Sequence, residues 1–68
     1  MQDHVYKITE IVGTSTKGVS EAIQNALARA SKTLHHIRWF EVGPVRGFVD
    51  GDKIQYQVVL KIGFALDD

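Results

Sequence analysis

The stretch "KIQYQVVLKIGFAL", residues 53–66, carries the clearest side-chain pattern in this chain of 68 residues. Its even positions are all large and aliphatic or aromatic: Ile54, Tyr56, Val58, Leu60, Ile62, Phe64 and Leu66. Its odd positions are mostly polar or small: Lys53, Gln55, Gln57, Val59, Lys61, Gly63 and Ala65. Successive side chains of a β-strand point to opposite faces of the sheet, so this alternation predicts a strand with one face in the core.

A second strand is expected immediately upstream, over residues 36–49. The two strands are joined by "VDGDK", in which Asp50-Gly51 is a strong hairpin signal because glycine accepts a positive φ without steric cost. Pro44 interrupts the second strand and has no N–H to donate to the sheet. A bulge or bend at Pro44 is therefore expected.

The N-terminal part of the chain predicts one more strand and one helix. Residues 4–12, "HVYKITEIV", are rich in β-branched and aromatic side chains, which favour a strand. After "GTSTKG", apolar residues recur at spacings of three and four: Val19, Ile23, Ala26, Leu27, Ala30 and Leu34. This spacing predicts a helix over residues 17–34, with Ser15 or Thr16 as its N-cap.

These elements predict an α+β fold of one domain, residues 1–68, with the order β-α-β-β. One helix would pack on one face of a three-stranded antiparallel sheet. The two long strands would exceed 40 Å if straight, at about 3.3 Å per residue, whereas the helix would be about 27 Å long. The sheet is therefore expected to curl around the helix.

The adjacent aromatic residues Trp39 and Phe40 must point to opposite faces of the second strand. We expect Phe40 to join the core and Trp39 to lie on the outer face with Val45 and Val59. A second subunit is the economical way to cover that face. Small domains are usually reinforced by disulfides, a metal or oligomerisation, and this chain has no cysteine. Oligomerisation is thus the expected reinforcement.

Composition excludes several classes of function. Eight basic and eight acidic residues cancel, which gives no electrostatic case for binding nucleic acid or an anionic membrane. No apolar run approaches the roughly 20 residues that span a bilayer, and the N-terminus has no signal-peptide pattern. The cytoplasm is the default location. The absence of cysteine leaves the redox compartment open.

Motifs for catalysis and metal binding are also missing from the sequence. "GTSTKG" has two glycines five apart, but a phosphate-binding loop would continue with Lys and then Ser or Thr. The adjacent residues His35 and His36 point apart in regular structure, so they do not chelate one metal ion. No nucleophile–base pattern or carboxylate pair is present. The chain is therefore not expected to be an enzyme or to hold a metal.

Trp39 is the remaining candidate for a functional residue. It shares the predicted outer face with Gln57, whose amide offers both a hydrogen-bond donor and an acceptor. An exposed indole and an amide suit a flat, hydrogen-bonding heterocycle. The competing interpretation is a plain contact between copies of the chain.

Five stretches together resemble the dodecin family. They are "ITEIVGTS", "EAIQNALARASKTL", "WFEV", "VRG" and "YQVVLKIGFALDD", and they cover nearly the whole chain in the same order and at the same spacings. The resemblance implies a sheet wrapped around one helix and a hollow homododecameric shell. It also implies flavin binding, storage or sequestration, and photoprotective quenching, rather than catalysis. The alternative from another class is a structural homo-oligomer without a physiological small ligand.

The resemblance further implies which residues bind the flavin. Trp39 matches the tryptophan that stacks on the isoalloxazine ring between subunits, Gln57 the glutamine that hydrogen-bonds its polar edge, and Arg46 a position near the flavin in bacterial members. FMN is the implied flavin, with riboflavin and FAD left open, and coenzyme A is left open as a further ligand. Several members carry arginine where this chain has Ala65, a departure that predicts weaker recognition of phosphorylated ligands.

Overall fold

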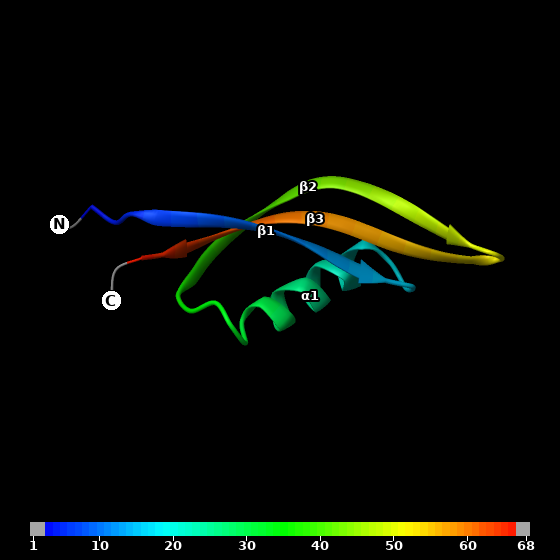
Figure 1. Cartoon of the computed structure of the whole chain (residues 1–68), viewed down its shortest axis with the longest axis horizontal. Helices are drawn as coiled ribbons and strands as arrows, with labels where there is room; N and C mark the ends of the chain where they lie inside the picture. The colour runs from blue at the N-terminus through cyan, green and yellow to red at the C-terminus, as the bar shows by residue number, and fades with distance from the viewer. Residues whose placement is uncertain (1–2, 67–68) are drawn as a thin grey trace.

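The computed structural model describes residues 3–66, and it has the predicted order of elements. Strand β1 (Tyr6–Ser15) is followed by helix α1 (Val19–Ala30), strand β2 (Ile37–Asp50) and strand β3 (Lys53–Ala65). Figure 1 shows the three strands as one layer that bends over the helix, with the β2–β3 hairpin extending beyond the end of α1. The predicted α+β fold with a sheet curved over one helix is confirmed.

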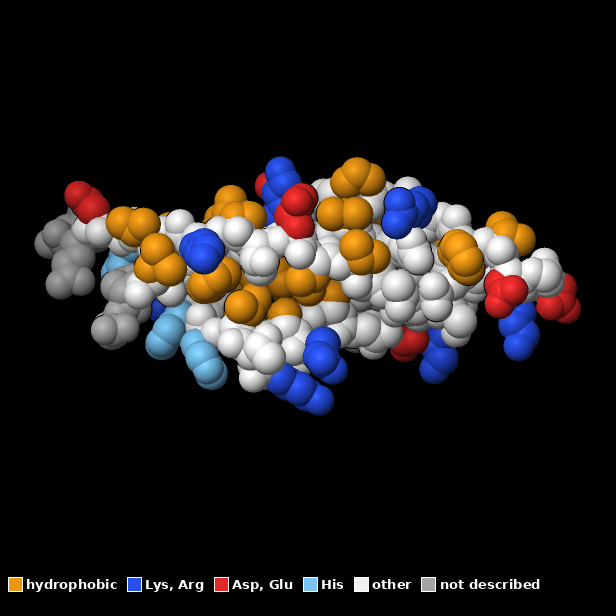
Figure 2. All heavy atoms as spheres, viewed as in Figure 1, with side chains coloured by type: hydrophobic (Ala, Val, Ile, Leu, Met, Phe, Trp, Pro, Cys, Tyr) orange, Lys and Arg blue, Asp and Glu red, His pale blue; other side chains and the backbone are white. Residues whose placement is uncertain are grey.

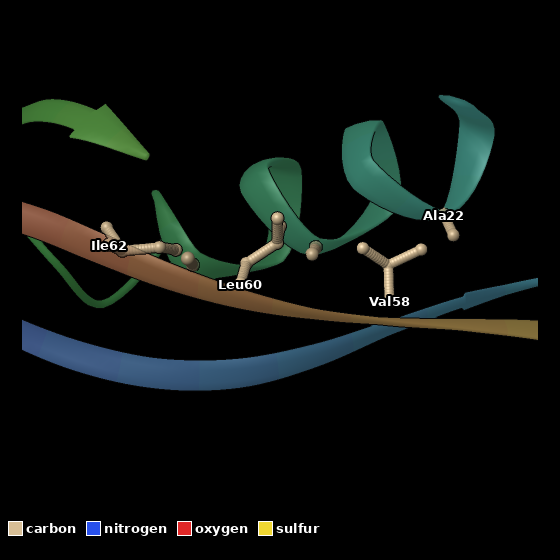
Figure 3. Close-up of a cluster of buried hydrophobic side chains, with 6 residues drawn as sticks. Ala22, Val58, Leu60 and Ile62 are labelled. Carbon is tan, nitrogen blue, oxygen red and sulfur yellow. The ribbon is translucent and has the colours of Figure 1, made fainter. Parts of the chain in front are cut away.

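Strand β3 lies in the middle of the sheet, and its position explains its pattern. The strand order is β1-β3-β2, and both pairings are antiparallel. Because β3 has a neighbour on each side and the helix against one face, its even-numbered side chains at the centre are completely enclosed. Val58, Leu60 and Ile62 have no solvent exposure and point toward the helix (Figure 3).

The helix presents small side chains to the sheet. The buried core consists of Val58, Leu60 and Ile62 from β3 together with three alanines one helical turn apart, Ala22, Ala26 and Ala30. Alanine has good helix propensity and little bulk, so the helix axis approaches the strands closely. The core is consequently thin, one layer of aliphatic side chains from one strand against a stripe of methyl groups.

Gly13 makes this close approach possible on β1. A Cβ atom at Gly13 would overlap the carbonyl oxygen of Ala22 and would lie 2.8 Å from Cβ of Ala26. Glycine is the only residue that fits there without a shift of the helix or the strand.

The helix is shorter than predicted, and its N-terminus is organised differently. It begins after the N-cap Gly18, which provides no side-chain cap. The hydroxyl of Ser15 instead accepts a hydrogen bond from the N–H of Lys17 at 2.9 Å and donates one to Glu21 at 3.0 Å. The prediction of Ser15 or Thr16 as N-cap is therefore wrong, because the serine stabilises the turn before the helix.

The C-terminal end of the predicted helix is replaced by tight turns. The N–H groups of Lys32 and Thr33 bond to carbonyls only three residues back, those of Arg29 and Ala30. Regular α-helix therefore stops at Ala30, although the apolar spacing continues to Leu34. Leu34 still packs against the core from this turn.

The expected irregularity at Pro44 is present and has a larger effect than predicted. The register of β2 shifts between Val42, which lies opposite Leu60, and Val45, which lies opposite Val58. Since residues opposite each other in an antiparallel pair share a face, Val45 lies on the helix side of the sheet. The prediction that Val45 shares the outer face with Trp39 is wrong, because the shift at Gly43 and Pro44 inverts the alternation.

The helix packs on β1 and β3, and the helix-side face of β2 is left largely open. Phe40 has the predicted orientation, opposite Ile62, but it is 44% exposed and lies outside the buried core. Val42, Val45 and Val49 follow it along the same face, and all three are exposed. We call these four residues the β2 apolar strip.

The dimensions of the molecule are unusual for its length. It measures 53 × 21 × 14 Å, and its radius of gyration is 14.1 Å, whereas a compact domain of this size has about 11 Å. Among the described residues, twelve large hydrophobic side chains are exposed and seven hydrophobic residues are buried. Figure 2 shows hydrophobic side chains along the length of the sheet. One copy of the chain therefore leaves much of its apolar surface uncovered.

Membrane insertion by a helix finds no support in the described part of the chain. Within residues 3–66, no helix is long and apolar enough to cross a bilayer.

Candidate functional site

The indole of Trp39 lies over Gly63 on the face of the sheet away from the helix. Trp39 is opposite Gly63 in the β2–β3 pairing. A Cβ atom at Gly63 would overlap three carbons of the indole, Cδ2, Cε2 and Cζ2. The ring thus occupies the space that a side chain at position 63 would fill, while 37% of the residue remains exposed. The predicted outer-face position of Trp39 is correct.

A pair of polar side chains, Arg46 and Gln57, lies farther along the same face. Arg46 is opposite Gln57, and its Nε donates a hydrogen bond of 2.7 Å to the Oε1 of Gln57. The register shift at Gly43 and Pro44 is what turns Arg46 outward, because Val45 before it points to the helix side. Gln57 is half-buried between its strand neighbours, and Arg46 is exposed.

Trp39 and Gln57 share a face but do not meet within one chain. Gly63, beneath the indole, lies six residues from Gln57 along β3, which corresponds to about 20 Å. A ring stacked on Trp39 is therefore out of hydrogen-bonding reach of Gln57 in the same chain. The structure brings Arg46 and Gln57 together and keeps Trp39 apart, so a site that uses all three residues requires at least two copies of the chain.

Charged and apolar residues occupy the space between these features. Lys61 lies between Glu10 on β1 and Glu41 on β2 in the same cross-strand row. In the next row toward Gln57, Val12 lies opposite Val59. The face between Trp39 and the Arg46–Gln57 pair therefore alternates between a charged row and an aliphatic row.

The chemistry of the face suits a planar ligand with polar edges. The indole offers a large aromatic surface for offset stacking. The amide of Gln57 and the guanidinium of Arg46 offer hydrogen bonds to carbonyl or phosphate oxygens. Among the described residues, no group of three or more His, Cys, Asp or Glu side chains is placed to hold a metal ion.

Gly63 is the residue of this site that sequence reasoning missed. It is an odd-numbered position in β3, where it reads simply as a small interruption of the polar face. An isolated glycine inside a strand pattern often marks a place where another group approaches the backbone closely. Gly63 alone therefore indicated such an approach in the sequence. The partner of the approach depends on the β2–β3 register, which contains two shifts.

A groove of about 570 Å³ lies elsewhere, between β1 and α1. Its lining includes Ile11, Thr14, Asn25, Arg29 and Leu34, and it contains none of the three predicted site residues. β1 is an edge strand, so the groove lies beside a strand that has no neighbour on one side within the chain. Its position next to an unpaired edge suggests a surface for packing against protein rather than a small-molecule pocket.

Comparison with known proteins supports one family. The family model described as Dodecin matches residues 5–67. The chain is 54% identical over 65 residues to the dodecin of Thermus thermophilus, which covers 94% of each chain. It also superposes on the solved dodecin of Streptomyces davaonensis with a TM-score of 0.92 at 50% identity, covering 98% of this chain and 100% of that one.

A third comparison gives the same result. The solved dodecin of Streptomyces coelicolor superposes with a TM-score of 0.91 at 48% identity and covers 100% of this chain and 99% of that chain. The family model, the relative and both structures span nearly the whole chain, including β3 and the strand that carries Trp39. The chain belongs to the dodecin family.

Proposed function

We propose that this protein binds flavin between copies of the chain in a homododecamer and sequesters it rather than transforming it. The observation that carries the proposal is the indole of Trp39, which lies over a glycine and remains 37% exposed on the outer face of the sheet. An exposed tryptophan supported by backbone on one side offers its other side to a flat aromatic ligand.

Each of the three proposed site residues has its own role. The indole of Trp39 stacks on the isoalloxazine ring. Gln57 of a different copy, because Gln57 is too far from Trp39 in its own copy, hydrogen-bonds the polar edge of the ring. Arg46, which is hydrogen-bonded to Gln57, lies beside this contact. FMN, riboflavin and FAD share this ring, so these contacts alone do not rank the three flavins. FMN is our first candidate on family grounds.

Assembly follows from the same geometry. The uncovered β2 apolar strip and the separation of Trp39 from Gln57 both support an assembly of several copies. A closed homo-oligomer would cover the β2 apolar strip and would bring Trp39 of one copy near Gln57 of another. Closed symmetric assemblies are the rule among soluble homo-oligomers. Twelve copies is the number that the family membership suggests.

Sequestration and photoprotection follow from stacking. Indole is readily oxidised, so at van der Waals distance it can donate an electron to excited flavin and quench its emission. Bound flavin would then return to its ground state without damaging other molecules. Membership of the dodecin family supports storage rather than catalysis.

Purified protein tests the proposal directly. Protein isolated from cells should be yellow, and heating should release a flavin that mass spectrometry identifies. Titration of the flavin-free protein with riboflavin and with FMN should quench flavin fluorescence almost completely. A colourless assembly that leaves the fluorescence of both flavins unchanged would contradict the proposal and favour a structural homo-oligomer.

A further inference from the structure

The hydrogen bond between Arg46 and Gln57 determines the polarity of the Gln57 amide. A guanidinium can donate hydrogen bonds and cannot accept them, so the amide atom that faces Arg46 must be the oxygen. The distance from Arg46 Nε to Gln57 Oε1 is 2.7 Å. The amide NH₂ must then point away from Arg46, and the carbonyl oxygen retains one further lone pair.

The sheet keeps this arrangement in place. Arg46 and Gln57 are directly opposite each other, so their Cβ atoms are held about 4.5–5.5 Å apart by the strand pairing. On the other side of Gln57, β1 places Thr14. A threonine hydroxyl can donate or accept, so Thr14 accommodates either amide orientation and imposes neither. Arg46 is thus the neighbour in this cross-strand row that selects one orientation.

We propose that Arg46 is a positioning residue whose function is to hold the Gln57 amide in a single orientation toward the ligand. This inference rests on the proposed function, because the ligand is the flavin edge. The ring edge alternates carbonyl oxygens and one N–H. An amide of fixed polarity matches such an edge in one alignment, with the amide NH₂ on a ring carbonyl, whereas a freely rotating amide matches it in two. Fixing the amide therefore raises affinity by removing the cost of ordering it at binding.

The competing role for Arg46 is a direct contact with the ligand. Its two terminal nitrogens are not used in the hydrogen bond to Gln57, and both roles predict weaker binding when Arg46 is removed. They differ in whether the effect of Arg46 depends on Gln57. A positioning residue acts only through the residue that it positions, so a double-mutant cycle separates the two roles.

The experiment measures riboflavin affinity by fluorescence quenching for the parent, Arg46→Met, Gln57→Ala and the double variant. Riboflavin has no phosphate, so a contact between Arg46 and phosphate does not contribute. We expect Arg46→Met to weaken binding by about threefold to tenfold when Gln57 is present, the range of one net hydrogen bond. In the Gln57→Ala background the same change should alter affinity by less than about twofold, because most of the coupling is lost with the amide.

Two further variants complete the test. Arg46→Lys restores a donor opposite Gln57 and should recover most of the lost affinity. Lys32→Met removes an equal charge from an exposed position in the turn after α1 and should have no effect. Equal weakening by Arg46→Met in both backgrounds, or no weakening in either, would overturn the positioning role while flavin binding by the parent stands. Absence of riboflavin binding by the parent would overturn the proposed function, and the inference with it.

Discussion

At the scale of single residues, the proposed flavin site depends on a pairing of the largest side chain with the smallest. Trp39 lies over Gly63 because the β2–β3 register places them opposite each other and glycine leaves the space empty. The glycine supports the ring from below with backbone atoms and keeps it close to the sheet. The indole therefore needs no additional aromatic partner to hold its position.

Trp39 should be the residue on which flavin binding depends most. Loss of a stacked aromatic surface costs about 1–3 kcal/mol per ring, by analogy with nucleic-acid bases stacked on aromatic side chains. Trp39→Ala should weaken riboflavin binding by that amount, and Trp39→Phe should retain part of the affinity with less quenching. Fluorescence titration measures both effects. Parent-like affinity and quenching in Trp39→Ala would mean that this tryptophan is only an interface residue.

Gly63→Ala tests the same pairing from the other side. The added methyl group would occupy the position of the indole carbons, so the ring must move away from the sheet. We expect a changed tryptophan emission spectrum and weaker riboflavin binding. Gly47→Ala is the matched control, because nothing lies within 4 Å of a Cβ atom at Gly47. If Gly63→Ala and Gly47→Ala gave the same spectrum and affinity as the parent, the position of the ring would not matter for binding.

At the scale of elements, two local features determine which surfaces are exposed. Gly13 lets α1 lie directly on β1, so the helix covers β1 and β3. The register shift around Pro44 then divides β2 into two halves of opposite alternation. Without that shift, Arg46 would point to the helix side, and its hydrogen bond with Gln57 could not form.

Gly13→Ala should destabilise the helix–sheet packing. The new Cβ atom would overlap the carbonyl oxygen of Ala22, so the helix must move outward or the strand must bend. Overpacking of this kind costs about 1–3 kcal/mol of unfolding free energy. Guanidinium unfolding followed by circular dichroism measures the loss.

The control for this prediction is Gly18→Ala, at the N-cap of the same helix. A Cβ atom at Gly18 meets nothing within 4 Å, and its φ of 161° is close to extended backbone. We expect its unfolding midpoint to stay near that of the parent. Equal stability of Gly13→Ala and Gly18→Ala would show that the helix position adjusts without cost.

At the scale of the whole molecule, one copy is incomplete. The buried core is a single layer, the shape is elongated, and the β2 apolar strip faces solvent beside the helix. Domains of about 60 residues bury only about 60% of the surface that their unfolded chains expose, which leaves little excess stability. We expect neighbouring copies of the chain to supply the missing burial.

We therefore predict that the protein has no stable folded monomer. Sedimentation should show an assembly of many chains, and the unfolding temperature should rise with protein concentration, as expected when folding and association are linked. Val45→Asp, which puts a charge into the β2 apolar strip, should impair assembly. Ser20→Asp, at an exposed position in the first turn of α1, should assemble normally. A folded species with the mass of one parent chain would contradict this prediction.

The sequence by itself determined the order of the elements and the central strand. Periodicity of two in residues 53–66 and spacings of three and four in residues 19–34 are local properties, so they can be read without knowledge of neighbours. The opposite orientations of Trp39 and Phe40 follow from the same rule. The family resemblance, carried by these segments and their spacings, was confirmed by the comparisons.

Tertiary structure decided the features that depend on pairing. The register shift moved Val45 to the helix side and brought Arg46 to Gln57, because one extra residue in a strand inverts every later side chain. The helix packs against β1 and β3, so Phe40 points to the helix side of the sheet but lies outside the buried core. The distance between Trp39 and Gln57, on which the proposed sharing of the site between copies rests, is set only when the strands are aligned in space. Sequence alternation assigns a side chain to a face of the sheet and says nothing of its position along the strand.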